Sequence, residues 1–448
     1  MPYPPNKPLD IIIVGGSITA IMHGITLHRL GHSIRILEQS LSTSPTSHLA
    51  GIVPSPVAIA FLNLYDNAAH IPLGTVVPPI KSSGGLHPVP RGNRIMTSWG
   101  ALYFRLRANF DSVGGGYIPD PPAVVCLDGE GVETAKARAV YESGQRVVDV
   151  REDSGEKGKV AVVVEDVALG TTRTLSADLV LGADGASSIV RKIFLGETVS
   201  RRYAGYVAWR GVVPESAVSE EAREAFKEDR THAASSRKYG QVTVYTVPGP
   251  TGSLEPGTRN INFIWYNPIP ISSLSRIMTD THGHAHRTTI PQGLMDPDIW
   301  DAQVALGASL LPRHHFEIMS KITSPFLHLI TDYTSPRASF LDGRVLLVGD
   351  AHTLLRPHIG YTTSMSALEA GWTEELVTGK ITLKEWEDRV NMTAYLHYCR
   401  GIWFGEAFIR PGSIRDYRLS AVWYWVVLAW YWVRVCWERE ISTHRGLR

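Results

Sequence analysis

The chain has 448 residues, 44% of them hydrophobic, and its 44 basic and 43 acidic residues leave a net charge of +1. This length favours two packed domains with a large core, and the balanced charge gives no electrostatic basis for binding nucleic acid. The three cysteines Cys126, Cys399 and Cys436 lie far apart and form no CxxC pair. This pattern argues against a disulfide framework or a zinc site and fits a reducing, cytoplasmic compartment.

The N-terminal region predicts a βαβ unit after a short disordered leader at residues 1–8. An apolar strand, Ile11–Val14, leads into a glycine-rich turn and a helix, and a second strand ends on Glu38. Dinucleotide-binding folds use this arrangement, with glycines beside the pyrophosphate and an acid about 20 residues later on a ribose hydroxyl. Here Ser17 and Ala20 replace two of the glycines, so an unrelated βαβ protein remains an alternative. The residues expected to line the turn are Gly15, Gly16, Ser17 and Ala20.

Several elements are predicted between this unit and the middle of the chain. Leu49–Leu62 predicts a turn and a helix, and Met96–Arg107 predicts a further helix. The alternating strands Arg146–Val150 and Lys159–Glu165 flank a charged turn and predict a β-hairpin.

Two further apolar strands each end in an aspartate turn. Leu179–Leu181 runs into Asp184 and Gly185, and Val345–Val348 runs into a glycine followed by Asp350. Continuous apolar strands are typical of sheets covered on both faces, and open α/β sheets bind ligands at the carboxyl ends of their strands. The Asp350 carboxylate suits a ribityl or ribose hydroxyl, although a strand followed by Gly-Asp is also a common structural turn.

A helix is predicted to begin shortly after the second turn. Thr362, Thr363 and Ser364 offer N-capping hydroxyls, and Pro357 and Gly360 precede them. Because a helix N-terminus carries partial positive charge and free N–H groups, it would stabilise an anionic group of a bound cofactor. The expected cofactor contacts here are Pro357, Gly360, Thr362 and Thr363.

The region 201–332 is predicted to form a domain built on an antiparallel sheet. Its expected strands are Tyr203–Val213, Gly240–Val247 and Arg259–Tyr266, and all three are rich in aromatic residues. One face of this sheet is expected to cover the active site, and an ordinary aromatic core is the alternative for any single residue. The candidates for the substrate pocket are Trp209, Tyr245 and Trp265.

The C-terminal segment Leu419–Val433 is uncharged and rich in tryptophan. It is shorter than the roughly 20 residues that cross a bilayer, and Arg434 ends the apolar run. Tryptophan and tyrosine do favour the headgroup zone of membranes. Membrane attachment and burial against the protein or a partner subunit therefore both stay open.

The order and spacing of the three turns resemble the single-component aromatic-ring hydroxylases of the para-hydroxybenzoate hydroxylase type, over roughly residues 8–400. Tyr203–Gly211, Asn262–Tyr266 and Arg356–His358 resemble the 2,6-dihydroxypyridine 3-monooxygenase branch. The resemblance implies an α/β protein: a Rossmann-like FAD-binding domain (βαβ, GR2-type) interleaved with an antiparallel-sheet substrate domain, plus C-terminal helices. The expected boundaries are 9–200 and 333–400 for the FAD-binding domain, 201–332 for the substrate domain and 401–448 for the aromatic helical segment.

The resemblance also implies the cofactor contacts. Non-covalent FAD would place its adenosine ribose on Glu38, its ribityl chain on Asp350, and its pyrophosphate, or the nicotinamide route, near Asp184 and Gly185. The family often has an arginine near the start of the second helix for the pyrophosphate, whereas this chain has Ser98 and Trp99 there. Arg107, or else Arg105, could substitute from a neighbouring turn, and an exposed helical arginine is the alternative interpretation of each. No metal is expected.

By resemblance, the reaction uses NADPH or NADH and O2 and proceeds through a flavin C4a-hydroperoxide that hydroxylates a phenolic or heteroaromatic small molecule, in secondary metabolism. The candidates for the substrate proton are His352, His358, Tyr206 and Arg210. In the family's commoner pattern the histidine comes one position later than His352, so its role does not carry over. The alternatives are a flavin epoxidase, an oxidative decarboxylase, or a catalytically idle flavin-binding partner. Two further possibilities stay open: attachment to a membrane and assembly into a homodimer.

Overall fold

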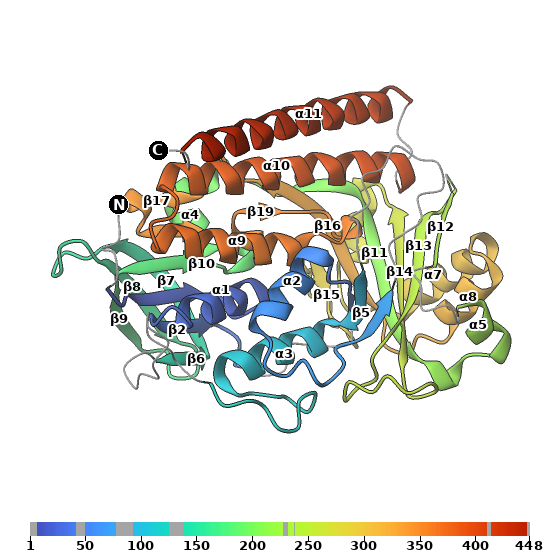
Figure 1. Ribbon diagram of the computed structural model, residues 1–448. Helices are drawn as coiled ribbons and strands as arrows, with labels where there is room; N and C mark the ends of the chain where they lie inside the picture. The colour runs from blue at the N-terminus through green and yellow to red at the C-terminus, as the bar shows by residue number, and fades with distance from the viewer. Residues whose placement is uncertain are drawn as a thin grey trace.

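A computed structural model describes the chain at residues 7–41, 50–77, 93–124, 138–226, 232–236, 238–409 and 414–445. The expected leader falls mainly on residues 1–6, outside this part of the chain. Two large sheets lie side by side, and the long C-terminal helices run across both (Figure 1).

The first sheet has six strands in the order β17, β18, β10, β1, β2, β6. All neighbours pair in parallel except β17, which pairs antiparallel with β18. The strands are β1 (Asp10–Val14), β2 (Ser33–Glu38), β6 (Ala139–Ser143), β10 (Leu179–Gly182), β17 (Ser339–Phe340) and β18 (Val345–Leu347).

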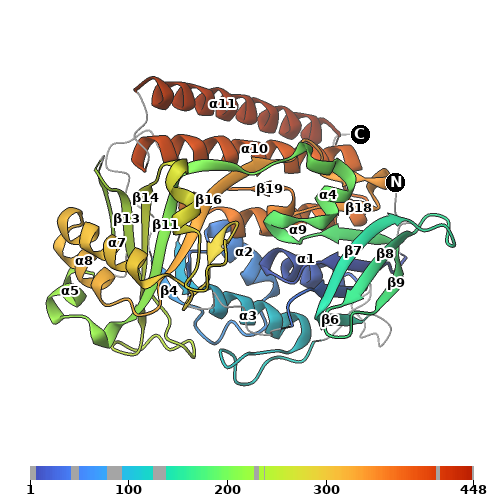
Figure 2. The same cartoon turned by 180° about the vertical axis from the view of Figure 1, so that it is seen from behind.

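Both faces of this sheet are covered, which explains why its strands are apolar without alternation. Ile11 and Ile13 of β1 face a core formed with helices α1, α3 and α9, while Ile12 and Val14 face strands β7 to β9 and helix α4. Figure 2 shows strands β7 to β9 and helix α4 from behind. The covering elements are α1 (Ile18–His28), α2 (Pro56–Tyr65), α3 (Trp99–Asp111), α4 (Ile189–Leu195), α9 (Thr362–Val377), β7 (Gln145–Glu152), β8 (Val160–Asp166) and β9 (Thr172–Ala177).

The second sheet is antiparallel, as predicted, with the order β12, β13, β14, β11, β16, β15. The three predicted strands are present within a residue or two, whereas β12, β15 and β16 were not predicted. Its outer face packs against α5, α7 and α8 (Figure 1). The elements are β11 (Arg202–Pro214), β12 (His232–Ser236), β13 (Gly240–Val247), β14 (Asn260–Pro268), β15 (Thr289–Ile290), β16 (Phe326–Thr334), α5 (Glu220–Ala225), α6 (Leu274–Ile277), α7 (Pro297–Leu310) and α8 (Arg313–Ser320).

One predicted helix begins later than expected. Met96 to Ser98 belong to strand β5 (Arg94–Ser98), which pairs with β3 (Gly51–Ile52) and β4 (Thr75–Val77). Helix α3 starts at Trp99 because the Ser98 hydroxyl accepts a hydrogen bond from the Ala101 N–H and caps it. The prediction of a helix from Met96 was therefore wrong for its first turn.

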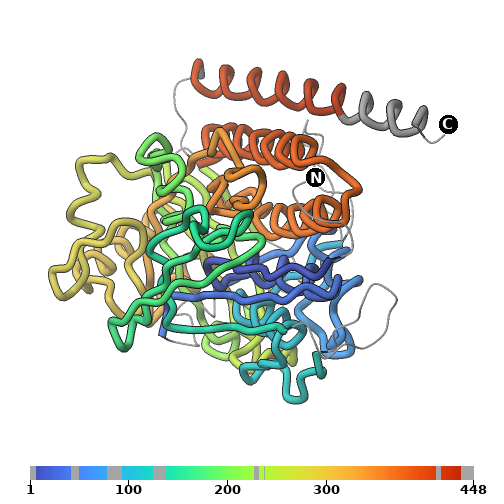
Figure 3. Tube along the Cα trace, turned by 90° about the vertical axis from the view of Figure 1, so that its left-hand side faces the viewer, coloured from blue at the N-terminus to red at the C-terminus, as the bar shows by residue number. Residues whose placement is uncertain are grey.

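Two long helices complete the chain. Helix α10 (Leu383–Phe408) begins with a capping box between Thr382 and Glu385, and α11 (Ile414–Arg445) packs against it as the outermost layer (Figure 3). None of the helices in the described ranges is both long and apolar enough to cross a membrane.

Candidate functional site

The topology brings the three turns together. Val14 of β1 pairs with Gly182 of β10, and Gly182 pairs with Leu347 of β18. Since these strands run parallel, the residues that follow them emerge at the same edge of the sheet. Gly15, Asp184 and Asp350, which are far apart in the sequence, therefore lie at neighbouring positions.

The first turn is built for a close backbone approach. Gly15 has φ +93°, and a Cβ there would lie 2.6 Å from the Ala183 carbonyl oxygen. The Gly16 N–H donates to the Glu38 carboxylate at 2.8 Å, so the turn and the end of β2 are tied together. The Ser17 hydroxyl is exposed and makes no cap hydrogen bond to α1. The Ser17 hydroxyl and the partly exposed Glu38 carboxylate are thus available to a ligand at this edge.

Ala20 and Arg107 take positions behind this turn. Ala20 is fully buried in α1, where a small side chain allows the helix to pack closely on the sheet. Arg107 is also buried; its guanidinium donates to Asp111 at 2.7 Å and to the Tyr103 hydroxyl at 2.9 Å, and lies 3.6 Å from the Tyr141 ring centroid. The Arg107 guanidinium is therefore held by neighbouring side chains of the protein.

Asp184 is turned inward in the second turn. Its carboxylate accepts hydrogen bonds from the N–H groups of Ile189 at 2.6 Å and Val190 at 3.2 Å, at the start of α4. Burial raises the pKa of this carboxyl group. Gly185 follows with φ +72° and begins the short turn η1 (Gly185–Ser187). In the structure Asp184 stabilises a helix start, and its backbone lies against Gly15.

Asp350 lies in the third turn, η6 (Gly349–Ala351), with its side chain partly exposed. Its carbonyl oxygen accepts a hydrogen bond from Tyr333. Burial raises the pKa of Asp350 to about 6, and the positive charge of Arg201 opposes this rise. The turn itself is held by Glu369, which accepts the Gly349 N–H at 2.7 Å.

The N-terminus of α9 is uncapped. The helix begins at Thr362 with Tyr361 as N-cap, and no side chain caps it. The hydroxyls that were expected to cap the helix do not do so. The Thr363 hydroxyl has no partner in the described part of the chain, and the Ser364 hydroxyl is hydrogen-bonded to Ser55. The preceding turn η7 (Pro357–Ile359) opens with exposed Pro357 and ends at Gly360 with φ +59°. The first N–H groups of α9 are thus left for a ligand.

The inner face of the antiparallel sheet carries a cation among tyrosines. The Arg210 guanidinium lies 3.5 Å from the Gly51 carbonyl oxygen, and the Gly51 N–H donates to Asn262 at 2.9 Å. Arg210 Nε and the buried Asn262 Nδ2 have no acceptor among the described residues. Tyr245 and Tyr266 lie on the same face, and burial raises the pKa of Tyr266 to about 12. Several hydrogen-bond donors therefore converge beside Gly51.

A buried polar chain lies nearby. Tyr206 shares a hydrogen bond of 2.8 Å with His358 Nε2 and accepts one of 3.2 Å from Arg356. Arg356 in turn donates to the fully buried Asp332 at 2.6 Å, which Arg202 also contacts at 3.1 Å. Burial and the charge of Arg356 hold the pKa of His358 well below its usual range, so this imidazole is neutral at physiological pH.

Three predicted site residues lie elsewhere. Trp209 and Trp265 point to the opposite face of the sheet, into the outer core around Trp300. His352 is fully buried, bonded through Nε2 to Asn391 at 2.8 Å and through Nδ1 to Thr353 at 3.0 Å. The structure does not bring these three side chains to the inner face where Arg210, Tyr245 and Tyr206 meet.

Sequence reasoning missed Asp332 and Glu369. Glu369 is an acid within the buried face of α9, and Asp332 is an acid at the end of an apolar strand. A charged residue at an otherwise buried position is the feature that could have identified both.

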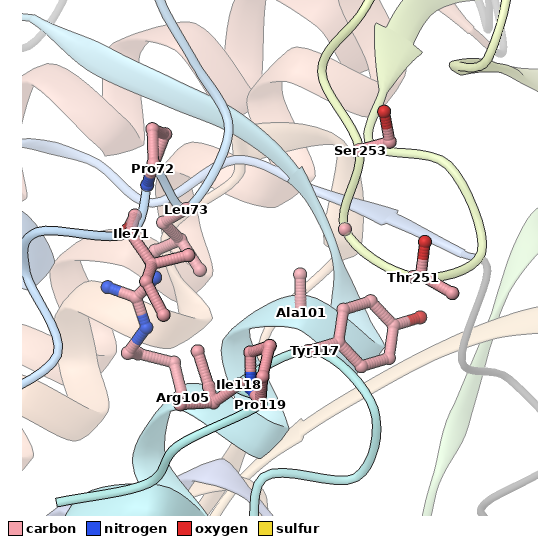
Figure 4. A pocket seen from close by; sticks show the side chains of 11 residues that line it. Ile71, Pro72, Leu73, Ala101, Arg105, Tyr117, Ile118, Pro119, Thr251 and Ser253 are labelled. Atoms are coloured by element: carbon pink, nitrogen blue, oxygen red, sulfur yellow. The ribbon is translucent and has the colours of Figure 1, made fainter.

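A pocket of about 300 Å³ lies between α3 and the 251–253 loop (Figure 4). Arg105 borders it, 3% exposed at its side chain and paired with Asp66 at 2.6 Å. None of its lining residues belongs to the three turns, so this pocket is separate from the candidate site.

Comparisons with known proteins find FAD-dependent relatives. The family model described as FAD binding domain-like matches residues 203–332. The chain is 26% identical over 385 residues to 2,6-dihydroxypyridine 3-monooxygenase of Paenarthrobacter nicotinovorans, covering 85% of this chain and 86% of that protein. It is 22% identical over 435 residues to an FAD-dependent monooxygenase of Aspergillus terreus, covering 92% and 89%.

Solved structures share the fold. That of 2,6-dihydroxypyridine-3-hydroxylase from Arthrobacter nicotinovorans superimposes with a TM-score of 0.70 at 23% identity, covering 91% of this chain and 95% of that one. HpxO of Klebsiella pneumoniae, complexed with FAD and uric acid, gives 0.61 at 17% identity, with 94% and 92% covered. The predicted resemblance and fold class are confirmed, and the role of a flavin monooxygenase is supported.

Proposed function

We propose that this chain, an FAD-dependent monooxygenase, hydroxylates a small aromatic molecule that bears an acidic ring hydroxyl, either a phenol or a hydroxylated heteroaromatic. The observation that carries the proposal is the Arg210 cluster on the inner face of the sheet, with Tyr266 and Asn262. A partly buried guanidinium such as that of Arg210 lowers the free energy of a neighbouring phenolate, and the electron-rich ring of a phenolate is what an electrophilic oxygen attacks.

FAD fits the residues at the sheet edge. The Gly15 turn leaves no room for a side chain, the Asp350 side chain is partly exposed, and α9 begins without a side-chain cap. Glu38 would hold the adenosine ribose, Asp350 the ribityl hydroxyls, and the α9 N-terminus the anionic edge of the flavin ring. When bound, FAD would supply the activation of O2 with electrons from NADPH or NADH.

Tyr206 and His358 are the proposed proton carriers. The lowered pKa of His358 disfavours a protonated imidazole, so this side chain would pass a proton on and would not hold it; its Nδ1 has no partner within the described ranges. Tyr206 connects this imidazole to Arg356 and hence to the interior carboxylate of Asp332.

The test is a substrate screen on the purified, FAD-loaded full chain. Phenols and hydroxypyridines should accelerate NADPH or NADH oxidation and gain one oxygen by mass spectrometry, whereas their methyl ethers should not. Arg210→Met should raise KM for the hydroxylated compounds at least tenfold, with Arg210→Lys intermediate. Loss of selectivity for the free hydroxyl with no effect of Arg210→Met would contradict the substrate assignment. Absence of any product would favour the idle flavin-binding alternative.

A further inference from the structure

Helix α11 exposes an apolar stripe on its outer side. Its members recur at helical spacings of three and four residues, so they share one face that runs ~21 Å along the axis. Several are more than half exposed, which is unusual for such large apolar side chains. The outer stripe consists of Leu419, Val422, Val426, Trp430 and Val433, and it is flanked by half-exposed Trp423, whose indole N–H donates to Tyr395 of α10 at 3.1 Å.

The opposite face of α11 fixes the helix to the protein. Tyr424 is 1% exposed and stacks on Trp403 of α10 with ring centroids 5.3 Å apart, and Val427 is buried beside it. Arg434 donates to Asp388 of α10. Because the inner face of α11 already packs against α10, the side chains of the outer stripe take no part in the protein core. Figures 1 and 3 show α11 as the outermost layer, and none of the other helices and strands that the structure describes lies over it.

The charges around the stripe favour an anionic partner. From Tyr417 to Val433 the helix contains no aspartate or glutamate, and its start carries exposed Arg415 and Arg418 with one exposed acid, Asp416, between them. Tryptophan beside arginine is the composition that prefers the headgroup zone of a bilayer. Tryptophan and arginine also occur at protein interfaces, so the feature that favours an anionic lipid surface is the absence of acidic side chains from Tyr417 to Val433 beside exposed guanidinium groups.

We propose that α11 docks the protein onto an anionic lipid bilayer, with the helix axis parallel to the membrane plane and the outer stripe buried at the headgroup boundary. The helix lies on the membrane and does not cross it, consistent with its interrupted apolar run. The proposal is independent of the reaction catalysed at the sheet edge.

Vesicle flotation of the FAD-loaded full chain tests it. The protein should float with vesicles of phosphatidylcholine and phosphatidylglycerol, and more weakly with phosphatidylcholine alone. Val422→Ser/Val426→Ser/Trp430→Ser should lower the partition coefficient at least tenfold. Leu64→Ser/Ile271→Ser removes equally exposed apolar side chains elsewhere and should leave it unchanged. Arg415→Glu/Arg418→Glu should abolish the preference for the anionic vesicles.

Two outcomes would overturn the proposal. One is wild-type protein that fails to float with either vesicle. The other is a dimer on size-exclusion chromatography that the triple variant dissociates, without any vesicle binding, because the stripe would then be an interface between copies of this chain. Equal flavin content in all variants confirms that each is folded.

Discussion

Two histidines six positions apart occupy different environments. His352 is saturated by Asn391 and Thr353, and burial lowers its pKa to about 4. His358 has one nitrogen on Tyr206 and the other without a partner in the described residues. Their chemical roles should therefore differ even though the sequence offers both as bases.

His358→Asn should lower kcat for hydroxylation by about 10²-fold with FAD content unchanged, because it removes the imidazole that relays a proton from Tyr206. Its loss of stability should be smaller than that of His352→Asn, because His358 is only partly buried. His352→Asn should instead lower the melting temperature, because it breaks a buried hydrogen-bonded pair. Steady-state kinetics and thermal unfolding on the same preparations distinguish the two. Equal kinetic defects at equal stability would contradict the assignment.

The buried Glu369 makes the protein less stable as pH rises. Burial raises the pKa of this carboxyl group from 4.5 to about 8, so the folded state keeps a proton that the unfolded state loses above pH 4.5. Stability from this group is therefore present below pH 4.5 and is lost as pH rises to 8. Glu369→Gln, which keeps an acceptor for the Gly349 N–H, should flatten this fall by on the order of a few kcal/mol. Urea unfolding at pH 5 and pH 8.5 measures it, and an unchanged difference would refute the claim.

The close packing of the turn after β1 against the end of β10 leaves no room for a side chain at Gly15. Gly15→Ala forces a Cβ against the Ala183 carbonyl at positive φ, and should destabilise the protein by about 3 kcal/mol and abolish FAD retention. Gly257→Ala has a similar φ of +87° with no atom within 4 Å, and should cost about 1 kcal/mol with FAD retained. Denaturant unfolding and flavin content separate them. Similar losses in both variants would show that the close approach of β1 and β10 is unimportant.

The elements that the sequence predicts well are those whose pattern is local. The parallel strands are continuous apolar runs, and β11, β13 and β14 combine aromatic and β-branched residues, so both sheets could be expected. The start of α3 was misplaced because Met96 to Ser98 suit a helix locally, but pair with β3 and β4 in the fold. The N-cap of α9 was misplaced because Ser364 is bound to Ser55, which is distant in sequence.

At the scale of the whole molecule, the cofactor edge was predictable and the proton-handling side chains were only partly so. Three turns at the carboxyl ends of parallel strands must meet once the strand order is set, so Gly15 and Asp350 follow from topology. The inward turn of Asp184, the engagement of Arg107 and the outward packing of Trp209 depend on side-chain contacts between distant segments. Such contacts leave no periodic pattern in the sequence.

The most direct test of the account is FAD binding by the isolated full chain. The purified protein should be yellow and retain flavin absorption through gel filtration. FAD added to the flavin-stripped protein should raise its melting temperature, and Asp350→Ala should reduce that rise. A colourless protein whose melting temperature does not change with added FAD would contradict the claim that the three turns form a flavin site.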